Sequence, residues 1–188
     1  MALRNAVLAA LLDGESSGYD LAKGFDASVA NFWMATPQQL YRELDRMAID
    51  GLITTRVVQQ ERRPNKRLHA LTPAGRAALH EFIAAPSKPT AIRDELMVKV
   101  QAMTIEDNPE VRTSVAGFAE RATAKLARYE RLRLRLLDGR SEQAFLSEAE
   151  RIGPYLTLLR GIAFEQENVR WAQFALTVID TRAASQLE

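Results

Sequence analysis

The side chains of this chain that are best suited to chemistry are cations and amides that can hydrogen-bond to nucleic acid. Residues 56–76 hold six basic residues and one acidic residue, Glu61. The cations nearest one another in this segment are Arg62, Arg63, Lys66 and Arg67. Basic residues gathered on one element are typical of contact with phosphate. A merely solvated basic turn is the alternative interpretation.

A second group of polar side chains comes shortly before the basic segment, at the start of an expected helix. Thr36 is a favourable N-cap, and Pro37 suits the first helical position because no N–H is needed there. Residues at the N-terminal end of a recognition helix reach base edges, and glutamine can pair with adenine through both amide atoms. The candidates for DNA binding are Thr36, Gln38, Gln39, Tyr41 and Arg42. An ordinary solvent-facing surface is the alternative.

The two groups belong to one pattern, a helix over residues 37–50 followed by a β-hairpin. The helix has apolar residues at helical spacing and ends at Gly51. Two stretches of alternating polarity then flank a turn at residues 62–66, as in a pair of half-buried strands. Their apolar positions include Ile53, Val57, Leu68 and Ala70. A groove-binding helix beside a basic hairpin predicts a winged helix-turn-helix.

The segments before and after this pattern read mainly as helices. We expect a core helix over residues 2–12 and a second helix capped by Ser17. Tyr19, near the start of that second helix, can donate to a phosphate or pack in the core. A fourth helix is predicted over residues 73–84. Pro86 and Pro89 favour extended backbone, so we place a domain boundary there, between a DNA-binding domain over residues 1–86 and a second domain over residues 91–188.

The second domain is predicted to be entirely helical. Helices are expected over residues 93–103, 108–137 and 141–184, with a break or kink in the last one at Gly153 and Pro154. Their apolar stripes indicate dimerisation rather than cofactor binding. The predicted fold class is therefore mainly α: an N-terminal winged helix-turn-helix with a two-stranded β wing, followed by an all-helical C-terminal dimerisation domain.

The composition argues against several other classes of protein. The 188 residues carry a net charge of +1, which argues against a histone-like, non-specific binder. There is no cysteine and there are two histidines, and no common catalytic or metal motif occurs. We therefore expect no catalytic residue, no metal and no cofactor. No apolar run approaches the roughly 20 residues of a membrane span, so we expect a cytoplasmic protein with no membrane partner.

Five segments, in this order, resemble the PadR family of bacterial transcriptional regulators in its long form. They are SGYDL at residues 17–21, QLYREL with GLI at 39–44 and 51–53, LTPAGR at 71–76, RDELMVK at 93–99, and LRGIAFE at 159–165 with Trp171. His69 stands where the family usually has tyrosine. The resemblance implies a homodimer held by the C-terminal helices on a double-stranded DNA operator with two half-sites. Some family members sense phenolic acids or lipophilic compounds.

Aromatic residues supply candidates for an effector site. A small aromatic or lipophilic molecule would suit a pocket lined by such side chains, although plain core or dimer packing is the alternative. The candidates are Phe32, Trp33, Phe164, Trp171 and Phe174. If such a pocket exists, we expect it between the winged helix and the C-terminal helices.

The sequence thus predicts a DNA-binding transcriptional regulator and not an enzyme. The expected form is a repressor that binds a palindromic operator as a homodimer and that a small effector can release. The alternative is a winged-helix protein-interaction module that does not bind DNA. The sequence leaves open the operator sequence, the regulated genes, the identity or existence of an effector, and whether the protein represses or activates transcription.

Overall fold

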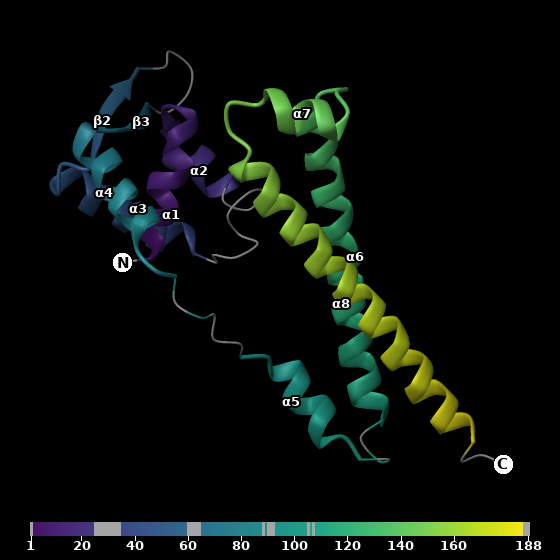
Figure 1. Ribbon diagram of the computed structural model, residues 1–188. Helices are drawn as coiled ribbons and strands as arrows, with labels where there is room; N and C mark the ends of the chain where they lie inside the picture. Colours follow the sequence, from purple (N-terminus) through teal and green to yellow (C-terminus); the bar gives the residue numbers. More distant parts are fainter. Residues whose placement is uncertain are drawn as a thin grey trace. The chain divides into compact units, whose positions relative to one another are not determined.

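The computed structural model divides into two compact units, Met1–Lys88 and Pro89–Glu188 (Figure 1). It describes residues 2–24, 35–59, 65–87, 89, 93–104, 106 and 108–185. We refer to the two parts as the N-terminal and C-terminal units and describe each by itself.

The N-terminal unit combines helices with a small antiparallel sheet. Its elements are α1 (Ala2–Ala10), η1 (Leu11–Asp13), β1 (Ser16–Ser17), α2 (Gly18–Gly24), α3 (Pro37–Ile49), β2 (Ile53–Val58), β3 (Lys66–Leu71) and α4 (Pro73–Ala84). The predicted winged-helix fold is confirmed, and the hairpin of β2 and β3 is the wing. A third strand joins it, because β1 pairs with β3 and gives the order β1-β3-β2. Two residues are too few to show alternation, so the pattern analysis missed β1.

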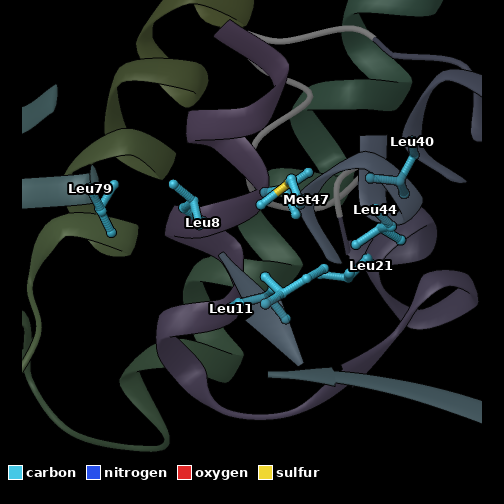
Figure 2. Close-up of a cluster of buried hydrophobic side chains, with 9 residues drawn as sticks. Leu8, Leu11, Leu21, Leu40, Leu44, Met47 and Leu79 are labelled. Atoms are coloured by element: carbon cyan, nitrogen blue, oxygen red, sulfur yellow. The ribbon is translucent and has the colours of Figure 1, made fainter. Parts of the chain in front are cut away.

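One apolar cluster holds the helices of the N-terminal unit together (Figure 2). The three buried side chains of α3 are apolar residues at helical spacing, Leu40, Leu44 and Met47. They pack with residues of α1, η1, α2, β2 and α4: Val7, Leu8, Leu11, Leu21, Ile53 and Leu79. Because α3 is fixed along this side, its opposite side is presented to solvent in a defined orientation.

The ends of α3 and α4 are set by side-chain caps. Thr36 and Gln39 form a reciprocal capping box at the start of α3, as detailed below. At the start of α4, the Thr72 hydroxyl accepts from the Gly75 N–H at 3.0 Å and donates to the Gly51 carbonyl at 2.7 Å. Thr72 therefore ties α4 to the turn that follows α3.

The C-terminal unit is helical throughout its described part, as predicted. It contains α5 (Glu95–Ala102), α6 (Asn108–Leu137), α7 (Glu142–Glu148) and α8 (Gly153–Ala184). The long helices α6 and α8 run side by side and cross (Figure 1). Gly153 and Pro154 do not kink a longer helix but begin α8, because proline in the first turn costs no helical hydrogen bond.

Two apolar clusters join the helices of the C-terminal unit. The first is centred on Val111, Val115, Ala172 and Ile179, and the inner side of α5 packs against it through Leu96, Val100 and Met103. The second is centred on Tyr129, Leu158 and Ile162. None of the helices in the described ranges has the length and hydropathy needed to cross a membrane.

Candidate nucleic-acid interface

The solvent-facing side of α3 carries most of the residues predicted to read DNA. Gln38, Arg42 and Arg46 are exposed and lie away from the buried side of the helix. Within the described part of the chain, neither arginine forms an ion pair, so both guanidinium groups are available to an external anion. A guanidinium group can bind phosphate or guanine through two parallel hydrogen bonds.

Gln39 has a structural role as part of the capping box at the start of α3. Its Oε1 accepts from the Thr36 backbone N–H at 2.9 Å, while its own N–H donates to the Thr36 hydroxyl at 3.2 Å. The amide oxygen that a bidentate contact with adenine requires is therefore already engaged. Among the described glutamines of α3, Gln38 is the one with both amide atoms available. Thr36 is also engaged within the protein, because its side chain is the N-cap of α3.

Tyr41 lies where α2 and α3 come close together. A Cβ atom added to Gly18 would stand 2.4 Å from Tyr41 Cε1, so a larger residue at this position would have to displace the Tyr41 ring. The ring of Tyr41 is nevertheless partly exposed. Tyr19, next to Gly18, is 68% exposed, so its side chain is not packed in the core and its hydroxyl faces solvent.

Two of the wing cations form ion pairs with carboxylates. Lys66 Nζ lies 2.8 Å from Asp20 Oδ2 in α2, and Arg67 Nη1 lies 3.7 Å from Asp45 Oδ1 in α3. These carboxylates are distant from the cations along the chain, so the sequence does not predict the two pairs. Arg62 and Arg63, predicted to lie at the wing tip, are outside the described residues.

A third wing cation, Arg56 of β2, is also paired. Its Nε donates to Glu15 Oε2 at 2.9 Å and to Oε1 at 3.1 Å, and a second nitrogen of the same guanidinium contacts Oε2. Arg56 lowers the pKa of the Glu15 carboxyl. In the same way, Lys66, followed by the Ser17 hydroxyl, lowers the pKa of Asp20. Both carboxylates are therefore held in the ionised form.

His69 is buried in β3, although the alternation of the sequence had placed Leu68 and Ala70 on the inner side of the wing. Its Nδ1 shares a 3.0 Å hydrogen bond with the Thr55 hydroxyl of β2. Burial, together with the nearby Arg67 charge, lowers the pKa of His69, and Asp45 opposes this in part. The imidazole is therefore held in its neutral form.

This burial predicts a pH-dependent stability of the N-terminal unit. The folded state disfavours the protonated imidazole, so unfolding takes up a proton once the pH falls below the ordinary histidine pKa of about 6.5. We expect thermal stability to decrease as the pH is lowered from about 7.5 to about 5.5. His69→Gln should flatten this decrease, whereas replacing the exposed His80 by glutamine should leave it unchanged. Equal pH dependence in wild type and His69→Gln would contradict the assignment.

The described members of the predicted effector site are spread over α8. Trp171 packs edge-to-face on Phe118 of α6, with ring centroids 5.9 Å apart. Phe164 and Phe174 are exposed. Phe32 and Trp33 lie outside the described residues. The described structure of the C-terminal unit therefore does not gather these aromatic side chains around one cavity.

A charged pair between the partly exposed Lys125 and the buried Glu165 connects α6 and α8. Glu165 is 4% exposed, and Lys125 Nζ lies 2.6 Å from its Oε1. Asn168 donates to the other oxygen, Oε2, at 3.0 Å. Burial by itself would lower the pKa of Lys125, but the contact with Glu165 outweighs burial and raises it. In the sequence, Glu165 stands out only as the last residue of the family motif at residues 159–165.

Comparison with known proteins assigns the chain to a family. Residues 7–81 match the family model for transcriptional regulators of the PadR-like family, and residues 92–180 match the model for the virulence activator alpha C-terminal domain. A probable transcriptional regulator of Mycobacterium tuberculosis is 33% identical over 181 residues, which cover 91% of this chain and 94% of that protein. The negative transcriptional regulator PadR of Bacillus subtilis is 28% identical over 179 residues, covering 95% and 97%.

Solved structures of related regulators have the same fold. Bacillus subtilis PadR in complex with operator DNA matches with a TM-score of 0.74 at 26% identity, over 95% of this chain and 99% of that chain. The same protein with p-coumaric acid matches with a TM-score of 0.67 at 27% identity, over 95% of each chain. The Vibrio cholerae virulence activator AphA matches with a TM-score of 0.68 at 28% identity, over 96% and 99%. The chain therefore belongs to the PadR family of transcriptional regulators, in the long form with a helical C-terminal domain, and it is not an enzyme.

Proposed function

We propose that this regulator binds operator DNA through the N-terminal unit, with α3 as the recognition helix. The observation that carries the proposal is the exposed side of α3, where Gln38, Arg42 and Arg46 are free of ion pairs within the described chain. The opposite side of α3 is buried in the core, which fixes the direction in which these side chains point. The complex of Bacillus subtilis PadR with operator DNA supports the binding of operator DNA.

Arg42→Ala should weaken operator binding. A lost bidentate contact to a base costs about 1–3 kcal/mol, and each lost phosphate contact reduces the slope of log K against log salt by about 0.9. A gel-shift titration at several salt concentrations, with DNA from upstream of the protein's own gene, measures both. Arg182→Ala, an exposed arginine of α8, is the matched control. Wild type that binds no DNA would favour the protein-interaction module, and unchanged Arg42→Ala binding would remove Arg42 from the interface.

We propose further that the C-terminal unit forms a homodimer and that the operator is palindromic. Phe164, Phe174 and Val178 are exposed and fall within about 80° of one another around α8, on a different side from the buried residues of the helix, such as Ile162, Ala172 and Ile179. Exposed apolar stripes of this kind mark protein interfaces. A two-fold dimer would present two recognition helices to two half-sites.

Phe174→Glu should convert the dimer to a monomer and reduce operator binding strongly. Phe174 is 69% exposed, so the substitution leaves the core of the unit intact while placing a charge in the proposed interface. Gln173→Glu adds the same charge to the neighbouring exposed position and should remain dimeric. Light scattering of both variants measures the molar mass. A dimeric Phe174→Glu protein would move the interface away from this side of α8.

The regulator is proposed to be a repressor with a small aromatic or lipophilic effector. Support comes from Bacillus subtilis PadR, which is a negative regulator and binds p-coumaric acid. AphA is a virulence activator, so whether this regulator represses or activates transcription needs a direct test. A reporter fused to the bound promoter should rise when the regulator is deleted. Titration of p-coumaric acid against tryptophan fluorescence and operator affinity tests the effector, since the chain has two tryptophans.

A further inference from the structure

Two ion pairs flank the short strand β1 and connect it to the wing. Glu15, immediately before β1, binds Arg56 of β2 through two hydrogen bonds from Nε at 2.9 and 3.1 Å. Asp20, in the first turn of α2 after β1, binds Lys66 of β3 at 2.8 Å. We call Glu15–Arg56 and Asp20–Lys66 the wing ion pairs. Each joins one wing strand to the segment that surrounds β1.

Backbone pairing alone joins β1 to the wing only weakly. It contributes two residues to the sheet, with Ser16 opposite His69 and Ser17 opposite Leu68. Asp20 is itself fixed, because its backbone N–H donates to the buried Ser17 hydroxyl at 3.1 Å and that hydroxyl donates to Asp20 Oδ2 at 2.7 Å. A rigidly held carboxylate can define where Lys66, and therefore β3, lies.

The same segment also contacts the proposed recognition helix. Gly18 begins α2 directly after β1 and lies against the Tyr41 ring of α3. A continuous series of contacts therefore runs from α3 through Gly18 and Asp20 to the wing. These contacts add to the core packing and to the Arg67–Asp45 pair that also join α3 to the wing, and a winged helix needs the angle between the two to match groove and flanking backbone at once.

We propose that Glu15 and Asp20 are positioning residues for operator binding: they hold Arg56 and Lys66 so that these cations orient the wing instead of binding phosphate. The inference rests on the proposed function, and it reassigns Lys66, which the sequence had predicted to contact DNA. A cation paired with a carboxylate adds no net charge toward a phosphate. The hydrogen bonds to the carboxylate also leave the cation fewer donors for such a contact.

Asp20→Asn and Glu15→Gln give opposite outcomes under the two roles. Each substitution is nearly isosteric and releases one wing cation while raising the net charge by one. If the cation orients the wing, operator affinity falls, by roughly threefold to tenfold. If the cation binds phosphate, its release strengthens binding. Glu81→Gln, at an exposed position of α4, is the control for added charge. Because exposed ion pairs contribute little to stability, unfolding by urea should change little in all three variants.

Lys66→Met completes the test in the full-length protein. We expect it to weaken operator binding as much as Asp20→Asn does, to add no further loss when combined with it, and to leave the salt slope within about 0.5 of wild type. The proposal is overturned if Asp20→Asn and Glu15→Gln bind the operator as tightly as wild type or more tightly, or if Lys66→Met lowers the salt slope by about 0.9 or more. Wild type that binds no DNA would instead overturn the proposed function.

Discussion

Replacing Leu44 by alanine is expected to lower the free energy of unfolding of the N-terminal unit by about 2–5 kcal/mol. Leu44 is 1% exposed and is the central one of the three buried side chains of α3 (Figure 2). Its truncation removes apolar contacts with the surrounding cluster and leaves a cavity that packed neighbours fill only in part. Because α3 depends on these contacts for its position, operator binding should fall as well.

Hydrogen exchange provides the measurement, because it separates the two units of the chain. Amides of α3 should exchange faster in Leu44→Ala, whereas those of α8 should keep their wild-type protection. Ile49→Ala is the matched control on the same helix, since Ile49 is 86% exposed and its loss should change stability by less than about 0.5 kcal/mol. Equal effects of the two substitutions would mean that α3 does not pack as described.

Gly75→Ala is expected to destabilise the N-terminal unit by about 3 kcal/mol. An added Cβ would stand 2.1 Å from the Leu52 carbonyl oxygen, which is a backbone atom that no side-chain rotation can move away. That oxygen also accepts from the Thr72 N–H at 3.1 Å, so displacing it would disturb the start of α4. The clash should outweigh the roughly 0.5–1 kcal/mol by which alanine favours a helix over glycine.

Gly153→Ala is the control for this prediction. Gly153 also lies in the first turn of a helix, but a Cβ added there would meet nothing within 4 Å. The substitution should be neutral or stabilising by up to about 1 kcal/mol. Urea unfolding followed by circular dichroism compares the two alanine variants. A Gly75→Ala protein as stable as Gly153→Ala would show that α4 can move off Leu52 without cost.

The elements with strong local signals could be predicted from the sequence to within a residue or so. The Thr-Pro starts of α3 and α4 carry their own caps, and the apolar spacing of α3 identifies its buried side. The 30-residue α6 was likewise predicted with its observed ends. In each case the information lies within a few residues along the chain, where capping and periodicity act.

The features that escaped prediction depend on residues far apart in the chain. Strand β1 exists because β3 lies beside it, and two residues give no periodic signal. The burial of His69 depends on the side that β3 turns toward the helices. The partners of Lys66 and Arg56 precede them by tens of residues, so the basic segment by itself does not predict these ion pairs.

The pairing of the buried Glu165 with Lys125 has a consequence for how α6 and α8 align during folding. Two long helices with apolar stripes can slide past one another by one turn and still bury much of the same surface. Such a slip would carry Glu165 away from Lys125 and leave a carboxylate enclosed without its cation, which is strongly unfavourable. The pair therefore penalises misaligned arrangements more than it strengthens the correct one. This contact near the middle of the two helices thereby favours one register of α6 against α8.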